Sequence, residues 1–76
     1  MRIYLGGHLN FYHPQKDKWL EVNIDQPVLL SEILNEVGIP LNEVQLVAVN
    51  GEVSELQSAY VSDQDEVKVF SPIGGG

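Results

Sequence analysis

The chain has 76 residues, of which 43% are hydrophobic and 20% charged, a composition typical of one small globular domain. Its formal net charge of -7 disfavours nucleic acid as a partner, since phosphate backbones attract cations. The absence of cysteine excludes disulfides, thiolate metal sites and a thiol nucleophile. The charge fits either plain solubility or a protein partner with a basic docking surface.

The first third of the chain predicts a β-hairpin. Residues 2–5 alternate in a strand pattern that continues past Gly6 and Gly7, where we expect a bulge or kink, to Phe11. Residues 13–18 predict a polar turn, and residues 19–24 alternate again. Residues 1–12 lack the pattern of a signal peptide, and no stretch has the roughly 18 apolar residues that span a bilayer. We therefore expect a cytoplasmic protein without a membrane partner.

An amphipathic helix is predicted next, because apolar residues fall at i, i+3, i+4 and i+7: Leu30, Ile33, Leu34 and Val37. Gly38 and Pro40 indicate where the helix ends. Its start carries Leu29 where a Ser, Thr or Asp cap is usual. The first helical amides therefore need another acceptor or water.

The second half predicts three further strand segments. Residues 46–49 form a short apolar strand, and Asn50-Gly51 favours a type I′ hairpin turn into residues 52–53. Residues 54–62 are irregular, with Leu56 and Val61 expected beneath the core. After a turn at residues 63–65, the last strand alternates; its predicted faces are Val67 with Val69, and Lys68 with Phe70.

This order predicts an α+β protein with the β-grasp (ubiquitin-like) fold: a mixed sheet of four to five strands with one main helix on one face. The first and last strands are expected to pair in parallel at the centre of the sheet. We expect one domain over residues 1–71 and a flexible glycine-rich C-terminal tail over residues 72–76.

The tail ends in Gly74, Gly75 and Gly76, so its last carboxylate follows three residues without side chains. Such an arm fits a narrow active site of another protein, where a Cβ atom would clash. Six residues follow Phe70 and span about 20 Å when extended. Phe70, Pro72, Ile73 and Gly74 are the candidate partner-binding residues, although Phe70 could equally cover the edge of the core.

Two stretches of the sequence resemble the ubiquitin-like sulfur carriers, a family that includes the small subunit of molybdopterin synthase and the thiamine-biosynthesis sulfur carrier. Residues 46–53 are similar to its Asn-Gly hairpin, and residues 65–76 to its acidic turn, last strand, proline and terminal diglycine. The chain departs from the family pattern at Gln64, Leu29 and the additional Gly74.

The resemblance implies a carrier rather than an enzyme, although a small synthase subunit could carry an enzyme's name. An E1-like activating enzyme would use ATP to adenylate the Gly76 carboxylate, and a sulfur donor would convert it to a thiocarboxylate. A synthase subunit would then accept the sulfur in molybdopterin or thiamine thiazole biosynthesis. Gly76 and Gly75 are the reactive residues, and no bound cofactor is expected.

Two other functions remain open: a ubiquitin-like protein modifier and a non-reactive β-grasp interaction module. Other candidate sites carry less weight. His8 and His13 lack partners at zinc spacing and are expected to be exposed beside a turn, so no metal site is predicted. No set of Ser, His and acidic residues suggests a hydrolase. The aromatic side chains of the predicted hairpin are expected to pack together: Tyr4, Phe11, Tyr12 and Trp19.

Overall fold

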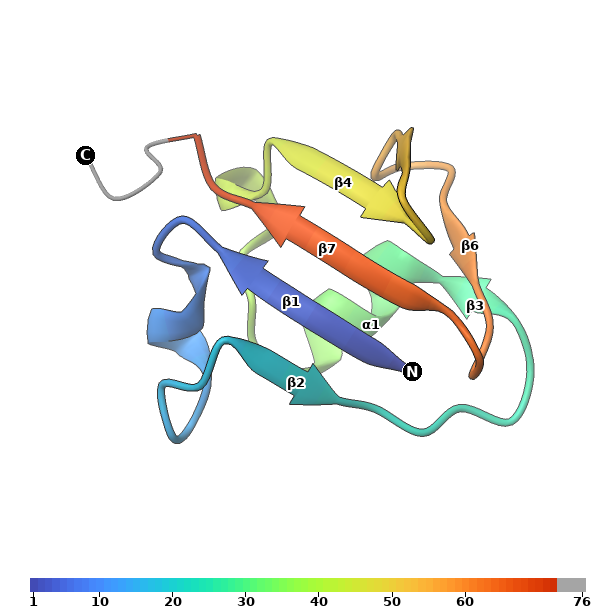
Figure 1. The fold of residues 1–76 in the computed structure, drawn as a ribbon, viewed down its shortest axis with the longest axis horizontal. Coiled ribbons are helices and arrows are strands. Elements are labelled where there is room, and N and C mark those ends of the chain that lie inside the picture. The colour runs from blue at the N-terminus through green and yellow to red at the C-terminus, as the bar shows by residue number, and fades with distance from the viewer. Residues whose placement is uncertain (73–76) are drawn as a thin grey trace.

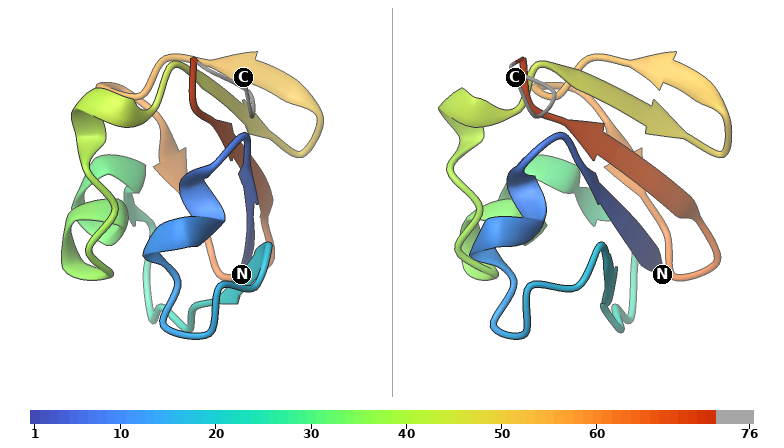
Figure 2. Two further views of the ribbon diagram at one scale, coloured as in Figure 1. Left: turned by 90° about the vertical axis from the view of Figure 1, so that its left-hand side faces the viewer. Right: turned by 60° about the vertical axis from the view of Figure 1, so that its left-hand side comes forward.

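The computed structural model describes residues 1–72, which form a twisted five-stranded sheet with helical segments on one side (Figures 1 and 2). In chain order, the elements are β1 (Arg2–Gly6), the 3₁₀ helix η1 (Leu9–Tyr12), β2 (Trp19–Glu21), β3 (Val28–Leu29), α1 (Leu30–Glu36), the 3₁₀ helix η2 (Leu41–Glu43), β4 (Leu46–Val49), β5 (Glu52–Ser54), β6 (Tyr60–Val61) and β7 (Glu66–Phe70).

The strand order is β2-β1-β7-β4-β5, so the first and last long strands lie at the centre. β1 and β7 pair in parallel with Ile3 opposite Val67, whereas β2, β4 and β5 join by antiparallel pairing. A mixed sheet with one α-helix across one face is the β-grasp fold, which confirms the predicted architecture.

The hydrophobic core lies between the inner face of the sheet and α1. Inward residues of β1 and β7 are fully buried, and Leu30 and Leu34 of α1 meet them with no exposed area. A seven-residue helix is marginal by itself, so this burial, about 1.5–3 kcal/mol per large apolar side chain, is what stabilises it. The helix has no side-chain cap at Leu29, as predicted, and the Leu30 amide donates to the Ala59 carbonyl at 2.9 Å.

Three predictions about the secondary-structure elements along the chain are wrong. The first strand ends at Gly6, and residues 9–12 form η1 instead of continuing the strand. β2 ends at Glu21 and so covers only the first half of the predicted second strand, although Val22 still exchanges hydrogen bonds with Met1. The segment predicted to be irregular contains β6, which pairs with β3 in a small second sheet. The Asn50-Gly51 turn is confirmed by positive φ angles at both residues, 51° and 86°.

Asp63 fastens the loop between β2 and β3 to the rest of the chain. Its Oδ1 accepts the Ile24 amide at 3.0 Å and lies 3.5 Å from the Met1 amino group. These contacts, the Ile24 hydrogen bond above all, lower the pKa of Asp63 below its ordinary value. A lowered folded-state pKa means stability that is present above the unfolded pKa and lost as the pH falls through the folded one.

We therefore expect Asp63→Asn to flatten the loss of stability below about pH 5. Urea unfolding between pH 2.5 and 7 measures this, with Asp17→Asn, at an exposed position before β2, as the matched control. An acid branch as steep in Asp63→Asn as in wild type would contradict the assignment.

Candidate functional site

The face of the sheet opposite α1 carries a connected apolar surface. The strand registers align one row across five strands: Trp19, Tyr4, Lys68, Ala48 and Val53. Phe70 and Leu46 are paired in the next row, beside Gly6. We call this surface the outer face. The helical segments of residues 1–72 lie on the opposite side of the sheet, so the outer face is uncovered there (Figure 2).

Phe70 lies on the outer face, and its side chain is half-buried. Its ring contacts Tyr4 at 5.9 Å between centroids, and Tyr4 in turn contacts Trp19 at 5.1 Å. A Cβ atom on Gly6 would overlap the Phe70 ring, so glycine at this position lets the ring lie flat over the end of β1. Phe70 therefore packs on the outer side of the sheet, not on the core.

Tyr4 and Trp19 belong to the outer face, whereas Phe11 and Tyr12 contact each other on η1 at 5.9 Å. The four aromatic side chains predicted to cluster on a hairpin thus form two separate pairs. Phe11 is 63% exposed, with the Lys16 ammonium 4.4 Å from its ring centroid. The prediction failed because it extended the first strand through residues that form η1.

The chain leaves the sheet at Ser71 and Pro72, which we call the tail root. Ser71 is the one polar residue classed as buried within residues 1–72, with 7% exposure, and Pro72 is exposed. The Ser71 Oγ accepts the backbone N–H of His8 at 3.2 Å and lies 3.3 Å from the His8 Nδ1. The turn after β1 therefore holds the point from which the C-terminal residues depart.

A chain of polar contacts continues from His8 to η2 and η1. The His8 Nε2 lies 3.2 Å from the Glu43 Oε1, and the Tyr12 hydroxyl donates to the Glu43 Oε2 at 2.7 Å. The Tyr12 hydrogen bond, supported by His8, lowers the pKa of Glu43, and the same bond raises the pKa of Tyr12. Figure 1 shows η1, η2 and the end of β7 in the left-hand half of the view, at the same end of the molecule.

These contacts bring together a Ser, a His and an acidic residue, a set that sequence reasoning did not find. His8 and His13 are also partly buried, not exposed as predicted. The set lacks the arrangement of a hydrolase, because the Ser71 hydroxyl is buried and already bonded to a backbone amide. Sequence separations of 63 and 35 residues left no local signal for it.

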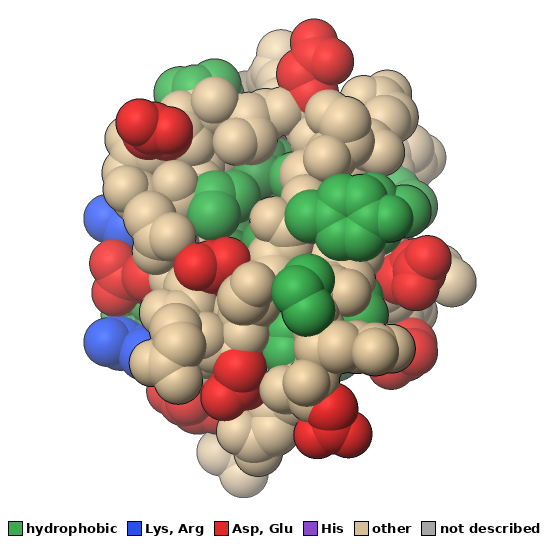
Figure 3. All heavy atoms as spheres, turned by 90° about the vertical axis from the view of Figure 1, so that its right-hand side faces the viewer, with side chains coloured by type: hydrophobic (Ala, Val, Ile, Leu, Met, Phe, Trp, Pro, Cys, Tyr) green, Lys and Arg blue, Asp and Glu red, His purple; other side chains and the backbone are tan. Residues whose placement is uncertain are grey.

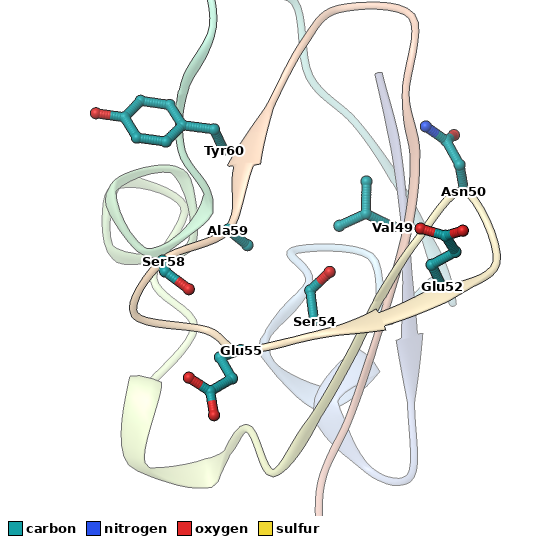
Figure 4. A pocket seen from close by; sticks show the side chains of 8 residues that line it. All are labelled: Val49, Asn50, Glu52, Ser54, Glu55, Ser58, Ala59 and Tyr60. Atoms are coloured by element: carbon teal, nitrogen blue, oxygen red, sulfur yellow. The ribbon is translucent and has the colours of Figure 1, made fainter.

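A hollow in the described surface lies at the other end of the sheet from the tail root. This open pocket of about 590 Å³ lies between β5 and β6, with Glu52 and Glu55 at its rim and Ala59 and Tyr60 on its wall (Figure 4). On this side of the molecule, acidic side chains surround a few apolar ones (Figure 3).

The sequence-predicted site residues divide in two. The structure places Phe70 on the outer face and Pro72 at the tail root. Four others lie outside the described residues: Ile73, Gly74, Gly75 and Gly76. Sequence reasoning missed Tyr4, Trp19 and Leu46 of the outer face, which join Phe70 only through strand register. Within residues 1–72, no three His, Asp or Glu side chains gather to hold a metal ion, and no helix is long and apolar enough to cross a bilayer.

The parallel central strands, the single helix and a C-terminal exit beside an apolar sheet face define a ubiquitin-like β-grasp protein. The model of the ThiS family matches residues 12–76, which is most of the chain. The chain belongs to the ThiS family, as its resemblance to the sulfur carriers predicted. A comparison with curated proteins found no match. Members of this family are small sulfur carriers rather than enzymes, and they interact with activating enzymes and synthases.

Proposed function

We propose that this protein carries sulfur as a thiocarboxylate on Gly76, for the biosynthesis of a sulfur-containing cofactor of the thiamine thiazole or molybdopterin type. The observation that carries the proposal is the family match, which runs through the glycine segment to residue 76. The fold supports it, because the central strand β7 ends at Phe70, immediately before the tail root.

The chemistry needs only the C-terminal carboxylate from this chain. One carboxylate oxygen attacks the α-phosphorus of ATP in the activating enzyme, and pyrophosphate leaves. Sulfide can then displace AMP from the acyl carbon and give the thiocarboxylate directly. A persulfide would instead give an acyl disulfide, which a second thiol reduces to the same thiocarboxylate while it becomes a disulfide. The anionic sulfur is a nucleophile for the acceptor substrate held by a synthase.

The outer face is the proposed docking surface for the activating enzyme. Its aromatic residues lie beside the tail root, so a partner that covers them also lies over the exit of the glycine segment. One row of the outer face contains Trp19, Tyr4, Lys68, Ala48 and Val53. Lys68 is its only charged residue, so the row is largely apolar. Aromatic side chains in such a position typically dominate interface energies.

We expect Phe70→Ala to raise the KM of the activating enzyme for this protein about tenfold, with kcat nearly unchanged. The change removes binding that exists before and during the reaction, so it acts on docking alone. Phe11→Ala is the matched control, since Phe11 is an exposed aromatic on η1 outside the outer face. Equal KM values for Phe70→Ala and wild type would show that docking uses another surface.

The intact mass of the protein purified from its native host tests the function directly. Replacement of one oxygen by sulfur at the C-terminus is the expected result. Attachment of the protein to lysines of other proteins would instead indicate a protein modifier. An unmodified mass, together with no pyrophosphate exchange by the activating enzyme of the same organism, would leave only an interaction module.

A further inference from the structure

The tail root is held in a tighter arrangement than a chain exit requires. Gly7 has a φ of +64°, and a Cβ atom there would overlap the Ser71 Oγ. The turn at Gly7 therefore lies directly against Ser71. Ser71 is buried and bonded to the backbone of His8, so the polypeptide is fixed immediately before the glycine segment begins.

The His8 imidazole connects this fixed point to two other segments. The Ser71 Oγ already accepts the His8 backbone N–H, so its own hydrogen is available for the His8 Nδ1. The remaining ring proton then lies on Nε2, facing the Glu43 Oε1. We assign this tautomer because it satisfies all three contacts at once. Glu43 is held in turn by the Tyr12 hydroxyl.

This connection matters because the tail root is the starting point of the segment that carries the reacting carboxylate. Five residues, ending with Gly76, follow Ser71 and, drawn out in a partner's site, span about 17 Å. Because this arm has a fixed maximum length, a shift of the tail root on the docked domain changes how far the reacting carboxylate reaches into the partner's site. Misplacement of a reacting group by about 1 Å can lower a rate a hundredfold.

We propose that His8 is a positioning residue: its Nδ1 holds Ser71 against the turn after β1, Glu43 orients the imidazole, and the fixed Ser71 sets the point from which residues 72–76 enter the activating enzyme. The inference rests on the proposed function, since it concerns delivery of Gly76 to an adenylating site. It adds a role for a histidine that touches neither ATP nor the acyl group. His8 acts after docking, so its loss lowers kcat more than it raises KM.

Two substitutions of His8 separate its contact with Ser71 from its contact with Glu43. His8→Asn keeps a polar atom at the δ position, within reach of Ser71, and loses the contact with Glu43. His8→Gln keeps a donor near the ε position for Glu43 and loses the contact with Ser71. His13→Gln removes an imidazole that accepts the Gln15 amide in the next turn, and serves as the control. Since 44% of the His8 side chain is exposed, these variants are expected to fold.

The experiment measures pyrophosphate exchange by the activating enzyme of the same organism at varied concentrations of the carrier. His8→Gln and Ser71→Ala should each lower kcat about threefold or more, with KM within about twofold of wild type. His8→Asn should retain most of the wild-type kcat, and the kcat of His13→Gln should match that of wild type. ¹⁵N relaxation at the Ser71 amide should show a lower order parameter in His8→Gln than in His8→Asn.

Unchanged kcat in His8→Gln and Ser71→Ala, with normal wild-type exchange, would overturn the positioning role and leave adenylation intact. Equal loss in His8→Asn and His8→Gln would overturn it as well, because the δ contact would then not matter. No exchange with the wild-type protein would instead refute the proposed function itself. Ser71 order independent of residue 8 would overturn the anchoring on which the proposal is built.

Discussion

Replacement of Gly76 by alanine is expected to lower adenylation at least about tenfold, which corresponds to about 1.4 kcal/mol of activation free energy, while the free energy of unfolding stays unchanged. The reason is steric. A site that protects an acyl-adenylate from water must be narrow around the last residues, and a methyl group obstructs passage there. Alanine is also excluded from backbone angles that glycine adopts freely.

The same substitution at neighbouring positions provides the controls. Gly75→Ala should also lower exchange about tenfold, whereas Gly74→Ala, one residue further from the reacting carbonyl, should have a smaller effect. Pyrophosphate exchange measures the activity, and urea unfolding measures the stability. Normal exchange by Gly76→Ala or Gly75→Ala with the cognate activating enzyme would refute the requirement for a narrow passage.

Local patterns in the sequence were sufficient to predict the faces of a strand that buries only one of its two sides. In β7, strict alternation predicted that Val67 and Val69 share one face and that Lys68 and Phe70 share the other; the structure confirms this division and buries the valine face. The Asn50-Gly51 turn was predictable because few residue pairs adopt two successive positive φ angles. These signals involve residues that are close in sequence, so a single chain contains them in full.

The errors have equally specific causes. Leu9 and Phe11 continue the alternation of β1, but Gly7 adopts a left-handed conformation and turns the chain into η1, where Leu9 is buried and Phe11 exposed. β3 and β6 have two residues each, too few for any period to show. Both failures arise where one backbone angle or one tertiary pairing decides the structure.

The candidate site was predictable only in part. The alternation of β7 placed Phe70 on the face opposite Val67 and Val69 but left open whether it covers the edge of the core. Its neighbours Tyr4 and Leu46 reach it only through pairing with β1 and β4. The contacts of His8 with Ser71 and Glu43 join segments far apart in the chain, and no spacing in the sequence announces them. Assembly of the sheet is what brings these residues together.

Gly7→Ala is expected to be the most destabilising alanine substitution among the three glycines of residues 1–72 with positive φ, at about 2 to 4 kcal/mol. Backbone strain alone predicts the opposite order. The φ of Gly7, +64°, lies where other residues can still be accommodated, whereas the φ values of Gly38 and Gly51, +89° and +86°, lie further outside that region.

The difference comes from the tail root. A Cβ on Gly7 overlaps the Ser71 Oγ, whereas a Cβ on Gly38 or Gly51 meets no atom within 4 Å. Urea unfolding of the three variants measures the contrast, and Gly38→Ala and Gly51→Ala should each cost only about 1 to 2 kcal/mol. A smaller cost for Gly7→Ala than for these controls would show that Ser71 yields without penalty. Its burial would then be no anchor for the residues that follow.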